Sequence, residues 1–432
     1  MVSVAQLKDV PASPSLRPDI AELRSRVAQI APQIKARAHT TEKAGRVPEE
    51  NIIALRNIGY FDIVKPAMFG GYEHDFDVLV ELNIELAKSC ASTAWVGGLL
   101  AAHQWLIAGF SEAAQRDVWA SNPDAVACGS YAPATKAIEV EGGYRLSGRW
   151  SFDAPATKAI AVDGGYRLTG RWSFASGCDN AQWSLCAALL PSKTESGQFA
   201  PAFLLVPAAD YLIDGTWNVV GLSGTGSKTL VLNDVFVPAH RLLSFADTTS
   251  GKTPGAALYA ANSTFAIPML SNIPSCLASA AVGAAAGALE DYLAVTSRRI
   301  TRGAVAGHNN RMADFPTIQL RVAEATASVD AAREVLLRDL RDRAATVRDH
   351  RPVSIEDRIV SRRGQAFSVA LAIRATEALN ASTGGLGLDL SNPVQRAWRD
   401  ANAVGRHISM NWDAVGTMYG QLALGLTPQG QY

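Results

Sequence analysis

Two of the seven histidines lie within apolar stretches of the chain. His103 follows Leu99-Leu-Ala-Ala, and His407 lies in the acid-free stretch Ala403-Val-Gly-Arg-His-Ile-Ser-Met. An imidazole titrates near neutral pH, so either side chain could take or give a proton in a reaction. A lone histidine on an apolar helix is more often a satisfied core residue, and residue type alone leaves both interpretations open. The other histidines lack metal-ligand spacing, and we expect no metal site.

A third candidate is the end of a predicted strand, Trp172-Ser-Phe174-Ala-Ser176-Gly177. A flat redox-active ring needs hydrogen-bond partners at its edge and a backbone that can approach it closely. Serine supplies the first and glycine the second. A plain turn at the end of a strand is the alternative interpretation.

The segment Gly221-Leu-Ser-Gly224-Thr-Gly-Ser227 is a glycine-rich loop. Such loops can present backbone N–H groups to phosphate. This one lacks the Lys-Ser/Thr ending and the strand–loop–helix context of a P-loop. A purely structural turn explains the glycines equally well.

The composition is that of an ordinary globular protein of 432 residues, with 48% hydrophobic and 19% charged residues. Forty basic and 40 acidic residues give no net charge, which argues against nucleic acid or an acidic membrane surface as the main partner. Five cysteines without a CxxC pair argue against a disulfide framework. No signal-peptide pattern and no uninterrupted apolar span of about 20 residues occurs, so we expect a soluble, cytoplasmic protein without a transmembrane helix.

Three regions follow one another along the chain. Residues 1–125 show helical periodicity, residues 126–245 show alternating strand patterns with frequent turns, and residues 246–432 return to helical periodicity. Four long stretches in the last region predict a helix bundle, at Ala278–Arg299, Ile318–Arg341, Glu356–Asn380 and Ala397–Leu424.

Residues 132–153 and 154–175 are near-copies in tandem. Two units are too few for a solenoid, so this is one duplicated segment of hairpin size. We expect the extra copy to loop out on the surface, where insertions cost little; a new wall on a pocket is the alternative. Only the second copy runs directly into Ser176-Gly177, so only that copy can take the original register in the β region.

The chain resembles the acyl-CoA dehydrogenase fold, and within it the flavin-dependent monooxygenases that hydroxylate phenols or oxidise dibenzothiophene. The resemblance covers about residues 24–425 and implies an α+β multidomain protein with an N-terminal helical domain, a central β-barrel domain and a C-terminal four-helix bundle. The motifs that carry it are Ile58-Gly-Tyr-Phe, Lys65-Pro-Ala-Met-Phe-Gly-Gly-Tyr, Leu99-Leu-Ala-Ala-His103, Trp172-Ser-Phe-Ala-Ser-Gly, Gly221-Leu-Ser-Gly-Thr-Gly-Ser, Asp234-Val-Phe-Val-Pro, Gly384-Gly-Leu-Gly and Arg396-Ala-Trp-Arg-Asp400.

The resemblance also implies roles for single residues. Ser176 would touch the N5 edge of the flavin, and Arg299 with Gly303 would hold flavin phosphate, often from a neighbouring subunit. Arg302 departs from this pattern, since the family has Phe there, and a cation-rich helix end is an equal alternative. His103 and His407 would be active-site histidines. The full set of implied flavin-binding residues is Trp172, Phe174, Ser176, Gly177, Gly224, Ser227 and Arg299.

Two flavin chemistries are distinguished by the residue that faces the substrate. An acyl-CoA dehydrogenase needs a carboxylate base, and in many of them it follows the Arg399-Asp400 pair at a place where this chain has His407-Ile408. We therefore expect the oxygenase component of a two-component monooxygenase that uses FMNH2 or FADH2 and O2, through a C4a-hydroperoxide, to hydroxylate a small aromatic substrate of the phenol or indole type. His407 would act as base or proton donor, and His103 would line the substrate side.

The resemblance implies a separate NAD(P)H:flavin reductase as partner, and the lack of a GxGxxG after a predicted strand is consistent with reduction on another protein. The family resemblance also implies a homotetramer. Two alternatives remain: an acyl-CoA dehydrogenase that oxidises a thioester with FAD, and a non-catalytic scaffold of the same fold.

Overall fold

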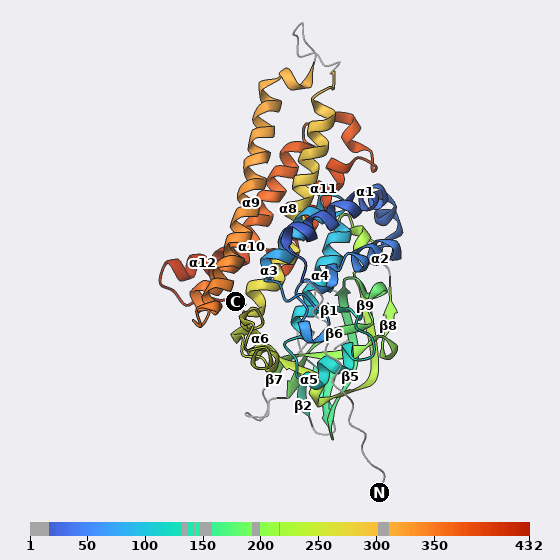
Figure 1. Cartoon of the computed structure of the whole chain (residues 1–432), viewed down its shortest axis with the longest axis vertical. Helices are drawn as coiled ribbons and strands as arrows, with labels where there is room; N and C mark the ends of the chain where they lie inside the picture. Colours follow the sequence, from blue (N-terminus) through green and yellow to red (C-terminus); the bar gives the residue numbers. More distant parts are fainter. Residues whose placement is uncertain are drawn as a thin grey trace.

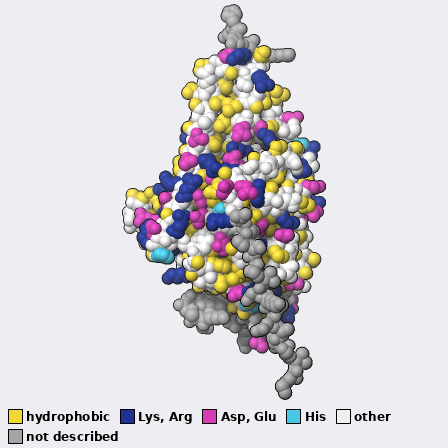
Figure 2. Space-filling view, viewed as in Figure 1, with side chains coloured by type: hydrophobic (Ala, Val, Ile, Leu, Met, Phe, Trp, Pro, Cys, Tyr) yellow, Lys and Arg dark blue, Asp and Glu magenta, His cyan; other side chains and the backbone are white. Residues whose placement is uncertain are grey.

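The computed structural model describes residues 17–131, 137–140, 143–146, 158–191, 199–215, 217–300 and 311–432. The molecule is elongated: long helices form one end, the β-sheets form the other, and the N-terminal helices lie between them (Figure 1). Acidic and basic side chains are interspersed on the face shown in Figure 2, as the zero net charge leads one to expect.

The N-terminal region is helical as predicted. Asp19 begins its first helix, since the Asp19 carboxylate accepts a hydrogen bond from the backbone N–H of Glu22 at 2.7 Å. The helices are α1 (Ile20–Ala44), α2 (Glu49–Asn57), α3 (Phe76–Ala87), α4 (Ala91–Ile107) and α5 (Glu112–Trp119). Helix α4 carries no Asp, Glu, Lys or Arg and is buried along almost all of its length, so it forms a central apolar rod.

The middle region consists of strands, as predicted. Two four-stranded sheets have the orders β1-β6-β7-β10 and β4-β5-β9-β8, and β2 with β3 forms a separate hairpin. The strands are β1 (Ala127–Ser130), β2 (Ala137–Val140), β3 (Gly143–Leu146), β4 (Lys158–Val162), β5 (Gly165–Ala175), β6 (Trp183–Pro191), β7 (Phe199–Pro207), β8 (Leu212–Asp214), β9 (Lys228–Pro238) and β10 (Leu242–Ser244).

The two copies of the duplicated segment have different places in the sheets. Strands β4 and β5 of the second copy pair with each other, and β5 continues into the sheet by pairing with β9. Among the described residues, β2 and β3 of the first copy pair only with each other. The prediction that only the second copy takes the sheet register is therefore confirmed. Parts of both copies, at 132–136, 141–142 and 147–157, lie outside the described residues.

Long helices form the C-terminal region. They are α8 (Met269–Thr296), α9 (Pro316–Arg348), α10 (Ile355–Asn380), α11 (Pro393–Gly405) and α12 (Trp412–Ala423), after the short α6 (Phe245–Ser250) and α7 (Pro254–Leu258). Within the described part of the chain, only α8 is long and apolar enough to cross a membrane by length and composition, and 94% of its most apolar window is buried in the protein. A core helix of a soluble protein passes the same test.

The prediction of one continuous helix over Ala397–Leu424 is wrong. Helix α11 ends at Gly405, a single 3₁₀ turn spans Ile408–Met410, and α12 begins at Trp412 and projects sideways from the bundle (Figure 1). His407 is the residue that caps this turn, because its ring nitrogen Nδ1 accepts a hydrogen bond from the backbone N–H of Ser409. His407 therefore lies in a break between helices, where its ring is not confined to a helix face.

Candidate functional site

Helix α4 carries one residue at each end of the candidate site, Trp95 and His103. They lie eight residues apart, which corresponds to about 12 Å along the helix axis. The end of β5 contacts α4 beside Trp95, and β1 contacts it beside His103. Helix α4 thus fixes the distance between the polar side chains around Trp95 and those around His103.

A chain of hydrogen bonds runs from Trp95 through three hydroxyl groups. The indole Nε1–H of Trp95 donates to Ser176 Oγ at 3.0 Å, and Ser176 Oγ lies 2.6 Å from Ser227 Oγ. Ser227 Oγ lies 2.8 Å from Thr225 Oγ1, which donates to the carbonyl oxygen of Leu222 at 2.9 Å. All three hydroxyl residues are buried.

The direction of each hydrogen bond in this chain follows by elimination. A carbonyl oxygen only accepts, so the single Thr225 hydroxyl proton is committed to Leu222. Ser227 must then donate to Thr225, and Ser176 must donate to Ser227. Ser176 keeps one oxygen lone pair beyond the one that accepts from Trp95. It therefore offers the site an acceptor and not a donor.

The backbone around Ser176 has two left-handed residues that bring β5 close to α4. Gly177 has φ of 76°, and a Cβ there would lie 2.9 Å from Val96 Cγ1, so only glycine permits this approach. Phe174 has φ of 64°, an uncommon value for a residue with a side chain, and its ring is 65% exposed. The Phe174 ring meets Trp217 edge-on at 6.2 Å between centroids. Strained backbone of this kind is concentrated at ligand sites.

His407 approaches the same cluster from the break after α11. Its ring lies 5.9 Å from the Trp95 ring in an edge-on arrangement and is partly buried. Burial, and then the positive charge of Arg362, lowers the pKa of His407 to about 4. The imidazole is therefore neutral at pH 7. Because Nδ1 accepts from Ser409 N–H at 3.1 Å, the proton of the neutral ring resides on Nε2.

His103 has the opposite tautomer. Its Nδ1 lies 2.6 Å from the carbonyl oxygen of Ala127, and since a carbonyl cannot donate, Nδ1 carries the proton. Its Nε2 is buried and has no hydrogen-bond partner among the described residues. Burial lowers the pKa of His103 to about 4. His103 therefore presents a neutral acceptor at Nε2, whereas His407 presents a neutral donor at Nε2–H.

Three residues predicted from the sequence lie outside this cluster. Trp172 is 1% exposed and donates to the carbonyl of Ala187 at 2.8 Å inside the β region. Gly224 faces helices, since a Cβ there would lie 2.7 Å from Thr41 Cγ2. Arg299 follows the end of α8 and donates to the carbonyl of Thr383. Gly303 and Arg302 lie outside the described residues.

Three residues of the site were not predicted from the sequence: Trp95, Thr225 and Tyr131. The Tyr131 ring lies 5.6 Å from the His103 ring, and its hydroxyl is buried without a hydrogen-bond partner among the described residues. Thr225 stands inside the glycine-rich loop, where its hydroxyl gave no separate signal. Trp95 could have been noticed as an indole two helical turns before His103 on the same apolar segment.

The buried carboxylate nearest to this chemistry in sequence, Asp400, has a structural partner. Its Oδ1 accepts from the backbone N–H of Leu222 at 2.6 Å, which holds the loop that ends the hydroxyl chain. Burial raises the pKa of Asp400 to about 6. The stretch around His407 itself contains no acid.

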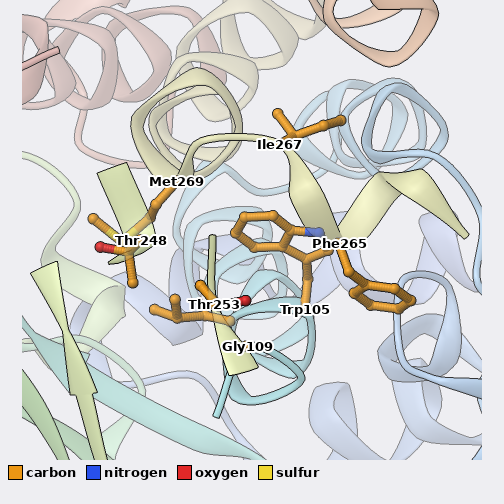
Figure 3. Close-up of a pocket in the computed structure, with 8 residues that line it drawn as sticks. Trp105, Gly109, Thr248, Thr253, Phe265, Ile267 and Met269 are labelled. Atoms are coloured by element: carbon orange, nitrogen blue, oxygen red, sulfur yellow. The ribbon is translucent and has the colours of Figure 1, made fainter. Parts of the chain in front are cut away.

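A small cavity near the C-terminal end of α4 is separate from this cluster. Trp105 and Phe265 line it together with Thr248, Thr253 and Met269 (Figure 3). Its volume of about 10 Å³ is room for one water molecule at most. A cavity of this size does not hold an aromatic ring.

Comparison with known proteins adds the family. The N-terminal domain model of the acyl-CoA dehydrogenases matches residues 18–122, and their C-terminal domain model matches residues 275–412. The chain is 61% identical over 414 residues to the oxygenase component of an FADH(2)-dependent resorcinol hydroxylase from Rhizobium sp. (strain MTP-10005), covering 95% of this chain and 96% of that protein. The chain belongs to the flavin-dependent monooxygenases of the acyl-CoA dehydrogenase fold. It is an oxygenase component of a two-component system, as the sequence predicted.

Solved structures of this monooxygenase family support the same assignment. The 3-HSA hydroxylase from Rhodococcus sp. RHA1 superposes with a TM-score of 0.84 at 31% identity, covering 96% of this chain and all of that one. XiaF from Streptomyces sp., solved in complex with FADH2 and glycerol, gives a TM-score of 0.81 at 26% identity over 95% of this chain and 97% of that one. The expected fold class, the flavin dependence and the monooxygenase class are thereby confirmed.

The residues at the end of β5 fit the reduced form of this family's flavin. A reduced flavin carries a hydrogen on N5, and Ser176 offers the acceptor lone pair that such a group requires. The exposed Phe174 ring supplies an apolar surface on the same strand. Ser176, Ser227 and Phe174 are the residues of this region that would hold the flavin ring.

Proposed function

We propose that this chain hydroxylates a small phenol, of the resorcinol class named for its 61% identical relative, with reduced flavin delivered by a separate NAD(P)H:flavin reductase. The observation that carries the proposal is the pair of neutral histidines with opposite tautomers, together with the lack of Asp or Glu in residues 403–410 around His407. An indole is a second candidate substrate, because a relative 26% identical to this chain is an indole-3-acetate monooxygenase.

When bound, reduced flavin would supply the two electrons that O2 needs for one of its oxygen atoms to enter the ring and the other to leave as water. His103 Nε2 accepts the hydroxyl hydrogen of the substrate, which raises electron density on the ring that is to be oxygenated. His407 Nε2–H donates a hydrogen bond from the flavin side. Ser176 would hold the N5 edge of the flavin through its free lone pair, and the apolar surface of α4 would exclude water.

Several finer features belong to the same proposal. FAD is the proposed flavin, since the resorcinol hydroxylase relative is named for FADH(2). The protein would be a cytoplasmic homotetramer with domains at 1–125, 126–245 and 246–432. Arg299 would reach flavin phosphate in a neighbouring subunit. Sedimentation velocity with and without flavin checks the assembly.

The test is single-turnover hydroxylation. Protein, photoreduced FAD and resorcinol are mixed with O2, and product and hydrogen peroxide are measured per flavin, with phenol and indole as further substrates. The variant His103→Asn keeps the donor to Ala127 and loses Nε2, while His407→Asn keeps the acceptor for Ser409 and loses Nε2–H. Each should form about a hundred-fold less product, as expected for loss of a proton-transfer group.

His350→Ala serves as the control, since His350 is exposed in the turn after α9, and it should match the parent protein. Full activity of both asparagine variants would overturn the assigned roles. Bleaching of bound FAD by an acyl-CoA without O2 would instead establish the dehydrogenase alternative.

A further inference from the structure

Arg362 on α10 is a buried cation without a carboxylate partner. Its side chain is among the buried groups, at 4% exposure, and no Asp or Glu of the described chain lies within ion-pair distance of it. Burial lowers the pKa of Arg362 to about 10, so the group is still charged at neutral pH. A buried charge without an ionic partner is costly, and its hydrogen bonds offset only part of that cost.

The guanidinium is held in place from α8. Its Nη1 donates to Gln365 Oε1 at 2.6 Å. The amide Nε2 of Gln365 donates in turn to the carbonyls of Leu270 and Ser271 and to Ser275 Oγ, each at 3.1 Å. Arg362 is therefore fixed to the first turns of the central bundle helix.

From this anchor Arg362 reaches the turn that carries His407. Its Nη2 donates to the carbonyl of Ser409 at 2.8 Å, and the N–H of the same Ser409 donates to His407 Nδ1 at 3.1 Å. The carbonyl of Ser409 thus accepts from the Arg362 guanidinium, while the N–H of Ser409 donates to the His407 imidazole. The position of Ser409 decides which nitrogen of His407 bears the proton.

Arg362 is the charged group that acts on the pKa of His407. Helix α4 contains no charged residue, and α8 contains none before Glu290. On α10, Asp357 pairs with Arg343 at 2.8 Å, Arg358 donates to the carbonyl of Thr249, and the Arg363 guanidinium lies 4.2 Å from the centroid of the Tyr419 ring. Glu356 is exposed in the first turn of α10, and Arg406, beside His407, is exposed as well. On the flanking helices, Asp400 of α11 accepts from the N–H of Leu222, and Asp413 of α12 is exposed. Arg362 is therefore the charged group that lowers the pKa of His407, after burial.

We infer that Arg362 is a positioning residue for hydroxylation: its hydrogen bond to the carbonyl of Ser409 holds the turn whose N–H keeps His407 as the Nε2–H tautomer. The inference rests on the proposed function of His407. The buried charge of Arg362, after burial itself, also opposes protonation of His407.

The test compares Arg362→Met, Arg362→Lys and Arg363→Met. Arg363 is the neighbouring residue on the same helix, but its side chain packs on Tyr419 of α12. Carbon-13-labelled histidine NMR, with His407 assigned from the His407→Asn spectrum, reports both tautomer and titration midpoint. This measurement needs neither flavin nor turnover.

In Arg362→Met the midpoint of His407 should rise by about one pH unit, and the Nδ1–H tautomer should become detectable. Burial remains, so the midpoint should stay below that of an exposed histidine. Arg362→Lys keeps the charge, so the titration midpoint of His407 in this variant should lie close to that of the parent protein. Arg363→Met should have the same midpoint as the parent. When product formed per flavin is plotted against pH, the fall in product at low pH should shift to higher pH in Arg362→Met by the same amount.

An unchanged tautomer and midpoint in folded Arg362→Met would overturn the inference. A changed midpoint together with no hydroxylation by the parent protein would leave the link from Arg362 to His407 standing and refute the proposed function. The two failures are therefore distinguishable.

Discussion

The hydrogen bond from Trp95 to Ser176 can be tested by a double-mutant cycle. Ser176→Ala removes the acceptor and leaves the indole N–H of Trp95 buried without a partner. Leaving a buried donor unsatisfied costs about 1–3 kcal/mol of unfolding free energy. Trp95→Phe removes the donor and part of the ring, at a cost that includes lost packing. In the double variant the unsatisfied donor no longer exists. The loss of unfolding free energy in the double variant should therefore be smaller than the sum of the two single losses by about 1 kcal/mol or more.

The assay is urea unfolding of the four proteins at one fixed concentration, followed by far-ultraviolet circular dichroism. A matched control is Trp105→Phe, on the same helix, because the Trp105 indole donates to the carbonyl of Thr264 and has no contact with Ser176. Its cost should add to that of Ser176→Ala within about 0.5 kcal/mol. Additivity in the Trp95 cycle as well would mean that the hydroxyl chain does not begin at this indole, and the acceptor role of Ser176 would fall with it.

Three further predictions follow from the geometry. Thr225→Val releases the end of the hydroxyl chain, so the ratio of reduced-flavin to oxidised-flavin affinity in anaerobic titrations should fall about five-fold, while Thr225→Ser should keep it; an unchanged ratio contradicts the assigned polarity. Because the folded-state pKa of His103 lies near 4, below its ordinary value, the unfolded chain protonates first and stability should be lost as pH falls from about 6.5 to 4, by about 1.4 kcal/mol per pH unit. Urea midpoints should show a flatter dependence in His103→Asn, and equal slopes would refute this. Deleting residues 132–153 should change the melting temperature and product yield little, since β2 and β3 pair only with each other among the described residues; collapse of either would make the first copy structural.

Several parts of the site could be predicted because local patterns carry them. The strand that ends in Ser176-Gly177 follows from alternation and from the small residues at its end, and the structure gives β5 that course. Helix α4 follows from its unbroken apolar run. In both cases the information lies within about a dozen consecutive residues, which is the range over which periodicity acts.

The parts that could not be predicted depend on contacts between distant segments. Trp95 meets Ser176 across 81 residues of sequence, and Arg362 meets Ser409 across 47. Nothing in a tryptophan or an arginine on a helix says which distant carbonyl or hydroxyl will face it. The break at His407 was missed for a related reason, because the helical spacing resumes in α12 and hides the turn.

The closed polarity of the hydroxyl chain also limits how protons move. A proton can hop along such a chain only if one end can release a proton and the other can receive it. Here the head is an indole N–H, which is not an acid in water, and the tail is a peptide carbonyl, which is not a base. The wall formed by Ser176, Ser227 and Thr225 is therefore an insulator. Among the described side chains of the candidate site, the groups left that could transfer a proton are therefore His103, His407 and the Tyr131 hydroxyl.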